Sequence, residues 1–159
     1  MDTITGRTDM SRRIILGSAA ALVVLGGAGA FALAYAGDQP PALNNSTARY
    51  TAPAGDGEGS FTFTTDVKAA SGVKSLKVLA WPAEGPFAKK PLTEKELAAA
   101  ESATCKPAGG DTARCTYKVT VTAAEAAESG TGRWYVATLA TAKNGDTAFA
   151  DKTTAFNVG

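Results

Sequence analysis

The sequence contains no histidine among its 159 residues. This absence excludes the Ser-His-Asp and Cys-His catalytic mechanisms, and it removes the usual nitrogen ligand of catalytic zinc. Ser71-Gly-Val-Lys74 has the spacing of a serine–lysine nucleophile motif, but it leads into a strand pattern rather than a helix, so we interpret it as a strand-entry turn. We therefore expect no catalytic site, no cofactor and no metal, and we expect that the protein is not an enzyme.

An excess of charge of one sign is also lacking. The chain carries 16 Lys and Arg against 15 Asp and Glu, and no basic run interrupts their mixture. Nucleic acid binding depends on concentrated positive charge, so the sequence predicts no nucleic acid partner. Asp56-Gly-Glu58 offers two carboxylates close together, but it lacks the regular ligand spacing of a calcium loop and is typical of a turn.

A charge-free stretch of 22 residues, Ile14 to Tyr35, follows directly behind Arg12-Arg13. It ends in the small-x-small pattern Ala34-Tyr35-Ala36, just before Gly37. We predict that residues 1–36 are an export signal peptide that is cleaved at this point. About 20 apolar residues also suffice to cross a bilayer, so a retained N-terminal anchor helix is the alternative.

The charges around this stretch predict where the rest of the chain goes. Positive charge precedes the apolar residues, which places residues 1–13 in the cytoplasm and the remainder outside. Ser11-Arg12-Arg13-Ile14-Ile15-Leu16 resembles the twin-arginine export pattern, and both that route and the general secretory route stay open. We expect a protein that is secreted or held at the outer face of the cytoplasmic membrane, with membrane contact only through its N-terminal segment.

Cysteine is scarce, and the two present are Cys105 and Cys115. An even count at short range in an oxidising compartment predicts a local disulfide. Such a bridge adds about 2–3 kcal/mol of stability. A loop braced in this way also suits a protease inhibitor, with Lys106 or Arg114 entering a trypsin-like specificity pocket. Gly109-Gly110 makes the loop flexible, however, so a structural staple is the preferred interpretation.

Alternation of apolar and polar residues predicts six or seven strands in the rest of the chain. Residues 37–47 have the composition of a linker. The expected strands are 48–52, 61–68, 73–81, 113–121, 133–142, 147–150 and 153–158, the last two being one broken strand or two short ones. Asn144-Gly145 predicts a tight hairpin. The inward face of residues 133–142 stays open, because Trp134/Val136/Ala140 and Tyr135/Ala137/Leu139 are both suitable.

Two segments have helical signals. Leu92 to Glu101 is the expected helix, since Thr93 and Glu96 have the spacing of a capping box. Thr122 and Glu125 repeat this spacing and predict a short helical turn before Gly130. Strands separated by turns, with one inserted helix, indicate an all-β chain, in which an antiparallel β-sandwich occupies residues 48–159.

Three segments carry a resemblance to known proteins. Residues 71–78 (Ser-Gly-Val-Lys-Ser-Leu-Lys-Val), 131–136 (Thr-Gly-Arg-Trp-Tyr-Val) and 142–148 (Ala-Lys-Asn-Gly-Asp-Thr-Ala) resemble immunoglobulin-like modules of bacterial exported proteins. The chain is similar to a family of small actinobacterial exported proteins of unknown function, over about residues 48–159. This resemblance implies an immunoglobulin-like sandwich and no catalytic residues. Antibody-type domains join their sheets by a long-range disulfide, whereas the pair here is local.

Three aromatic residues on the expected strands are candidates for ligand contact. Trp81, Trp134 and Tyr135 could form a platform for a sugar, although a sandwich of this size needs its aromatic residues mainly for burial. At most one of the three is expected to be exposed, since Trp134 and Tyr135 must face opposite sides of their strand.

These observations together predict an exported, non-catalytic β-sandwich with a binding or structural role at the cell surface or in the extracellular space. Its partner is not specified by the sequence; a cell-wall glycan and another extracellular protein are the two classes considered. The alternative function is inhibition of a serine protease through the Cys105–Cys115 loop.

Overall fold

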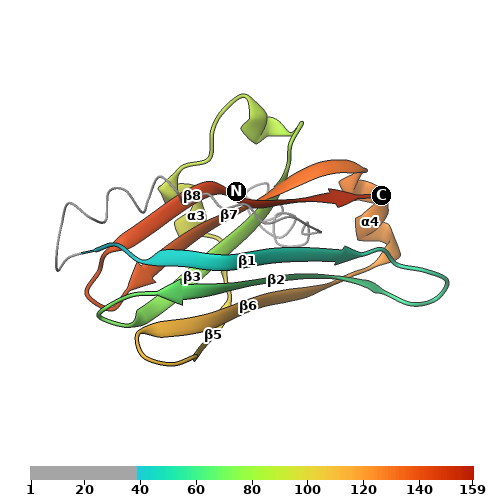
Figure 1. Ribbon diagram of the computed structural model, residues 1–159. Helices are drawn as coiled ribbons and strands as arrows, with labels where there is room; N and C mark the ends of the chain where they lie inside the picture. The colour runs from blue at the N-terminus through green and yellow to red at the C-terminus, as the bar shows by residue number, and fades with distance from the viewer. Residues whose placement is uncertain (1–38) are drawn as a thin grey trace.

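Residues 39–159 are described by a computed structural model, in which two antiparallel β-sheets pack face to face (Figure 1). The chain is mostly β, as predicted, and it forms a sandwich. The predicted export segment, with Ala34, Ala36 and Gly37 at its cleavage site, lies outside the described residues. Within the described range, no helix is long and apolar enough to cross a membrane.

Each sheet has four strands. Sheet A has the order β1-β2-β6-β5 and is made of β1 (Ala42–Thr51), β2 (Gly59–Lys68), β6 (Thr112–Val121) and β5 (Thr104–Pro107). Sheet B has the order β4-β3-β7-β8 and is made of β4 (Glu101–Ser102), β3 (Val73–Pro82), β7 (Gly132–Ala142) and β8 (Thr147–Val158). The chain changes sheets at Ala103, whose N–H donates to the carbonyl of Leu76 at 2.8 Å.

The main core lies between the two sheets, where alternate residues of each strand point inward. Phe61 of β2 packs against Phe156 of β8 with ring centroids 5.3 Å apart, and Trp134 of β7 lies 6.0 Å from the same ring. Phe61, Phe63 and Val67, which alternate with polar residues along β2, are all buried. β3 lies between β4 and β7, and a strand inside a covered sheet has apolar residues on both of its faces.

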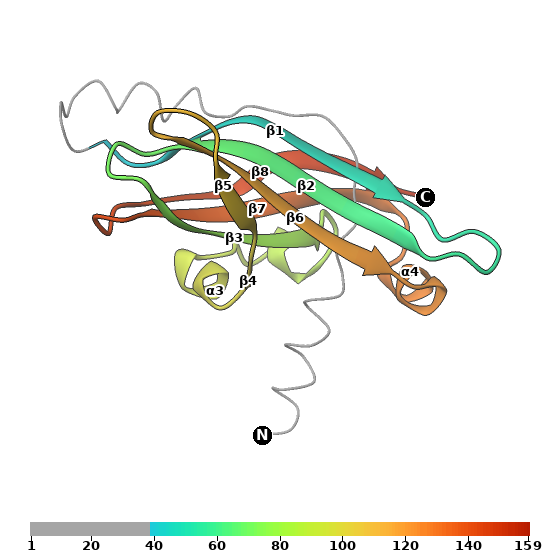
Figure 2. The ribbon, with the colours of Figure 1, turned by 90° about the horizontal axis from the view of Figure 1, so that it is seen from below.

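A second apolar cluster lies on the outer side of sheet B, beneath the connection from β3 to β4. This connection contains a 3₁₀ turn, η1 (Pro86–Ala88), and a helix, α3 (Glu94–Ala98). Leu92 and Leu97 are buried there together with Trp81 and Leu139. Figure 2 shows the resulting order of layers, with sheet A, sheet B and α3 in succession. Sheet B is therefore covered on both faces.

The β3–β4 connection covers the outer side of sheet B, so both faces of β7 are buried. Trp134, Val136 and Ala140 belong to the core between the sheets, and Ala137 and Leu139 belong to the outer cluster. Both faces are buried because each has its own apolar partner layer.

Both predicted capping boxes are present, at Thr93–Glu96 and at Thr122–Glu125. The second begins α4 (Ala123–Ser129), which confirms the short helical turn. The prediction of a helix over residues 92–101 was too long at both ends. Glu101 pairs with Val78 as part of β4, so strand pairing ends the helical segment at its C-terminal side.

The first strand begins at Ala42, inside the segment predicted as a linker. The sequence pattern fails here because the strand contains a register shift between Asn44 and Thr47. The side chain of Ser46 turns inward and hydrogen-bonds to the hydroxyl of Thr65 at 2.7 Å. Asn45 has a φ of 54°, a value that Asn tolerates better than most residues. Contacts to β2 therefore stabilise a strand whose composition is polar.

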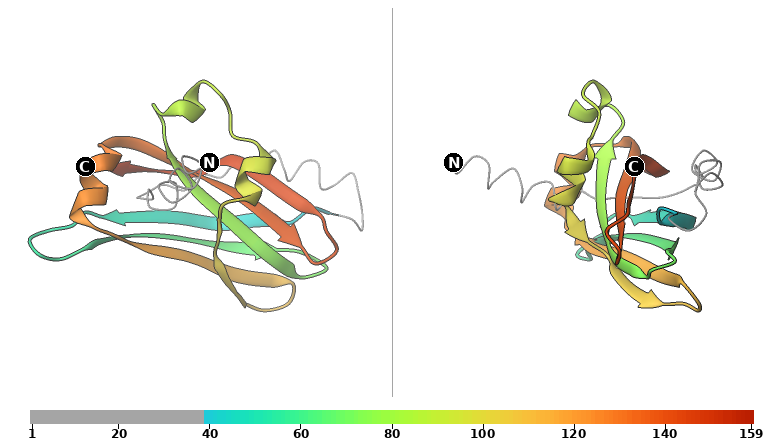
Figure 3. Two further views of the ribbon diagram at one scale, coloured as in Figure 1. Left: turned by 180° about the vertical axis from the view of Figure 1, so that it is seen from behind. Right: turned by 90° about the vertical axis from the view of Figure 1, so that its left-hand side faces the viewer.

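All four edge strands carry a feature that limits pairing with another chain. β1 has the register shift just described, β4 has only two residues, and β5 has four and ends at Pro107. β8 is one strand with an irregularity, since the pairing with β7 skips from Thr154 to Ala150. The edge-on view in Figure 3 (right) shows how β8 (red) and β1 (cyan) meet at one side of the sandwich, where the two strands are in contact.

Candidate functional site

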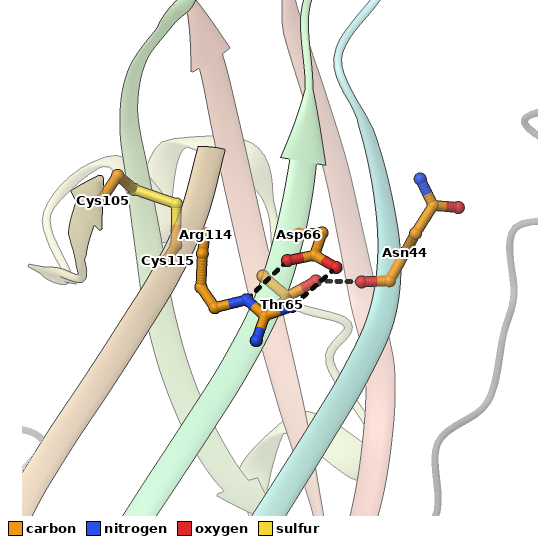
Figure 4. The surroundings of a disulfide bond; sticks show 6 residues. All are labelled: Asn44, Thr65, Asp66, Cys105, Arg114 and Cys115. Carbon is orange, nitrogen blue, oxygen red and sulfur yellow. Dashed lines mark hydrogen bonds and ion pairs between the residues drawn. A yellow bond between two sulfur atoms is a disulfide. The ribbon is translucent and has the colours of Figure 1, made fainter. Parts of the chain in front are cut away.

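The predicted disulfide is present and joins two neighbouring strands of sheet A. Cys105 of β5 lies directly opposite Cys115 of β6, with an S–S distance of 2.03 Å and a Cα–Cα distance of 4.0 Å. Figure 4 shows this bridge at the side of the sheet. A Cα–Cα distance this short belongs to the non-hydrogen-bonded class of cross-strand pairs, which brings side chains closest together. The bridge therefore ties the four-residue edge strand β5 to the longer strand β6.

The segment between the cysteines is a hairpin rather than a long loop. Lys106 pairs with Arg114 and Pro107 pairs with Ala113, so only residues 108–112 lie between the last paired positions. Gly109 and Gly110 have φ values of 107° and 59°, which other residues rarely adopt. The two glycines therefore serve the turn geometry, and the two cationic side chains at either end of the segment lie in strands.

Arg114 is engaged in an ion pair across the outer face of sheet A (Figure 4). Its Nε and Nη2 atoms donate to the two carboxylate oxygens of Asp66 at 2.8 and 3.2 Å. Asn45 Nδ2 donates to the same carboxylate at 2.9 Å. These hydrogen bonds stabilise the charged carboxylate, so Arg114 first and Asn45 second lower the pKa of Asp66 below its ordinary value. The group joins β1, β2 and β6.

Asp66→Asn is expected to reduce the free energy of unfolding at neutral pH, because it removes the ion pair with Arg114. The reduction is only about 1 kcal/mol, since the arginine side of the pair is largely exposed. The pKa of Asp66 is lower in the folded than in the unfolded chain. Its stabilisation is thus complete above the unfolded pKa of about 3.9 and is lost as pH falls through the folded value. Urea unfolding from pH 7 to pH 2 should show the two proteins converging at low pH. Glu84→Gln, at an exposed site, is the control; a gap that does not change with pH would contradict the assignment.

The three aromatic candidates lie on two different faces of sheet B. Trp134 is 2% exposed and belongs to the core between the sheets. Trp81 and Tyr135 lie on the outer side, with ring centroids 4.9 Å apart. Trp81 is also covered by Phe87 at 6.2 Å, and only 4% of its surface is exposed. The structure thus brings two of the three candidates together and leaves Tyr135 alone partly exposed.

Two further contacts fix the Trp81 side chain. Its indole N–H donates to the carbonyl of Asp151 at 2.9 Å, within the irregular part of β8. The ammonium group of Lys152 lies 4.9 Å from the Tyr135 ring and 5.9 Å from the Trp81 ring. A buried tryptophan with its N–H satisfied acts as an anchor for the chain that covers it.

The serine–lysine motif and the Asp56-Gly-Glu58 segment, which the sequence offered as chemical sites, begin in turns between strands. Ser71 lies in the turn before β3, and its hydroxyl accepts a hydrogen bond from the N–H of Asn144 at 3.2 Å, as expected for a strand-entry turn. Asp56 lies in the turn that links β1 to β2, where Ala54 and Gly57 form an isolated bridge. Across residues 39–159, no group of three or more Asp, Glu or Cys side chains is placed to hold a metal ion.

Two features of this region were not predicted. The strands β4 and β5 are too short to show alternation, and the partners Asp66 and Arg114 are 48 residues apart in the chain. The only sequence signal for the ion pair was that Asp66 and Arg114 each lie on the polar face of a predicted strand.

The disulfide, with Cys115 buried in the core, is compatible with an extracellular location. No curated protein and no solved structure matches the chain. Residues 43–140, from β1 into β7, match a family of unknown function, DUF5707, and the chain therefore belongs to that family.

Proposed function

We propose that this protein is an exported, non-catalytic β-sandwich module with a binding or structural role outside the cytoplasm. The observation that carries the proposal is the Cys105–Cys115 bridge between an edge strand and its neighbour. Disulfides that only hold structure form and persist in oxidising compartments, which agrees with the export signal predicted for residues 1–36.

The strand order supports an immunoglobulin-like topology for this module. Immunoglobulin domains place strands A-B-E-D in one sheet and C-F-G in the other, with C′ added beside C in variable-type domains. The order β1-β2-β6-β5 against β4-β3-β7-β8 corresponds to A-B-E-D against C′-C-F-G. Domains of this architecture serve many unrelated functions, so the topology supports the scaffold and its surfaces must supply the binding.

A non-catalytic role agrees with the contacts of the polar groups. The buried hydroxyls of Ser46 and Thr65 bond to each other, as do those of Thr138 and Thr153. Tyr117 donates to Glu101 at 2.7 Å and so links the two sheets. Among the described residues, no buried side-chain nitrogen or oxygen lacks a hydrogen-bond partner. These groups are used to hold strands together.

Protease inhibition through residues 105–115 is the alternative from another class. Such inhibitors present a lysine or arginine on an exposed binding loop. Lys106 and Arg114 lie in paired strands, and Arg114 is also bound to Asp66, so the geometry favours a structural role for the hairpin.

Export is tested by the N-terminus of the protein recovered from its cells. We expect chains that begin at Gly37, or within a few residues of it, in the medium or the cell-wall fraction. The physical reason is that a small-x-small site behind an apolar stretch is read by signal peptidase. Edman sequencing or mass spectrometry of the intact protein measures this. An intact Met1 in the membrane fraction would favour the anchor, and an intact Met1 in the cytoplasm would refute the proposal.

A further inference from the structure

The outward face of sheet A concentrates positive charge that is scattered along the sequence. Strand register places six charged residues on this face, and we call it the basic face: Arg49 of β1, Asp66 and Lys68 of β2, Lys106 of β5, and Arg114 and Lys118 of β6. Five of the six are cationic, although the whole chain has nearly equal numbers of both signs. Every second side chain along a strand lies on the same face of the sheet, and residues that pair across neighbouring strands also share a face.

The single carboxylate on the basic face is already neutralised. Asp66 is bound by Arg114 through two hydrogen bonds, so this pair contributes little net charge to the surface. The other four cations are exposed and make no ion pair within residues 39–159. Their net charge of about four is therefore available to a ligand in solution.

Within residues 39–159, every carboxylate side chain except Asp66 lies outside the four strands of sheet A, although Asp111 lies in the turn between β5 and β6, next to the β6 residue that pairs with Lys68. Glu94 and Glu96 belong to α3, which lies on the far side of sheet B (Figure 2). Glu125 and Glu128 belong to α4, and Asp56 lies in the turn after β1. Asp111 offsets one positive charge at this end of the basic face, and the remaining cations leave the face with an excess of positive charge.

The spacing of these cations suits a polymer rather than a small anion. Neighbouring strands are about 4.8 Å apart, so Arg49 and Lys118, which flank Thr62, are separated by about 10 Å. Lys106 and Lys118 lie in rows four residues apart, which corresponds to about 13 Å along the strands. These separations are between backbone positions, and together the cations extend over more of the sheet than one small anion covers, so a chain of anionic groups can contact more of them than a single phosphate or carboxylate can.

The residues between the cations indicate which polymer fits. Thr47, Thr64, Thr116 and Thr104 form one row across all four strands of the sheet. Their hydroxyls can donate to and accept from the hydroxyls of a sugar chain. No aromatic residue faces outward on these strands, so the face has no stacking platform for single-stranded nucleic acid and no apolar centre for a protein partner.

We infer that the basic face of sheet A binds an anionic polysaccharide of the cell surface. The inference rests on the proposed function, because it requires a chain that has been exported. Lysines and an arginine contact the anionic groups, and the threonine row contacts the sugar hydroxyls. The face of a four-stranded sheet is wider than the major groove of duplex DNA, which admits only about two strands, so duplex nucleic acid is the poorer ligand.

The test uses the protein as recovered after export and agarose beads that carry polygalacturonate. We expect retention at low salt and release as the salt concentration rises, because exposed charges are screened. The variant Lys68→Gln/Lys106→Gln/Lys118→Gln should bind about tenfold more weakly. The matched control Lys89→Gln/Lys90→Gln/Lys95→Gln removes the same charge from the side that carries α3, and it should bind like the unmodified protein.

Four outcomes would overturn the inference: retention that salt does not reduce, equal losses in the two triple variants, equal binding to neutral dextran, or equal binding to duplex DNA. Far-UV circular dichroism of both variants shows whether they are folded. Failure here with an exported chain would leave the proposed function standing. A cytoplasmic chain with an intact Met1 would instead remove the proposed function.

Discussion

Trp81→Ala is expected to lower the free energy of unfolding by about 3–5 kcal/mol, the usual range for removing a buried tryptophan. The ring is covered by Phe87 and packs on Tyr135, and its N–H bonds to the carbonyl of Asp151. Its removal leaves a cavity between sheet B and the β3–β4 connection. Urea unfolding followed by the fluorescence of Trp134, the other tryptophan of the chain, measures the loss.

Two matched variants separate the causes of this loss. Trp81→Phe retains an aromatic ring but loses the hydrogen bond, so it should be less harmful than alanine. Phe149→Ala changes a large side chain that is 36% exposed, and it should change stability by less than about 0.5 kcal/mol. Trypsin should also cleave Trp81→Ala more rapidly after Lys89, which lies in the covering segment. A Trp81→Ala protein as stable as Phe149→Ala would show that Trp81 does not anchor the cover.

Breaking the Cys105–Cys115 disulfide is expected to reduce stability by about 2–3 kcal/mol, since the bridge closes a loop with a sequence separation of 10. The effect comes mainly from the unfolded chain, which gains conformational freedom when the bridge opens. Unfolding of the protein with and without reductant measures it, and thiol titration should find no free thiol before reduction. The double variant Cys105→Ala/Cys115→Ala has no thiol, so its stability should not respond to reductant.

The local consequence of opening the bridge is equally specific. β5 is a four-residue edge strand that pairs with β6 alone, so hydrogen exchange of its amides should accelerate more than that of β2 in the centre of the sheet. Uniform acceleration throughout sheet A would contradict the view that the bridge acts as a staple for its edge.

Much of the fold could be predicted because its signals are local. The alternation in β2 and β6 depends only on the period of two that every strand has, and both capping boxes depend on residues three apart. The disulfide was predicted from two cysteines at short range. The polar first half of β1 and the short strands β4 and β5 were missed, since neighbouring strands rather than their own composition stabilise them.

The candidate sites show the same division. Alternation placed Trp134 and Tyr135 on opposite faces of one strand, but it could not show that a covering segment buries Trp81 and leaves Tyr135 partly exposed. The absence of a basic run predicted no nucleic acid partner, and cations spaced along several strands gave no sign of a common surface. Strand order and register bring Arg49, Lys106 and Lys118 onto one face.

Residue order along the chain was therefore enough to establish a disulfide-bonded β-sandwich. The three-dimensional arrangement alone decided which faces are covered, which ion pair forms and where positive charge collects. The physical reason is the distance along the sequence over which each interaction acts. Alternation, capping and turn formation involve residues a few positions apart, whereas packing and electrostatic potential depend on residues that only long-range strand pairing brings together.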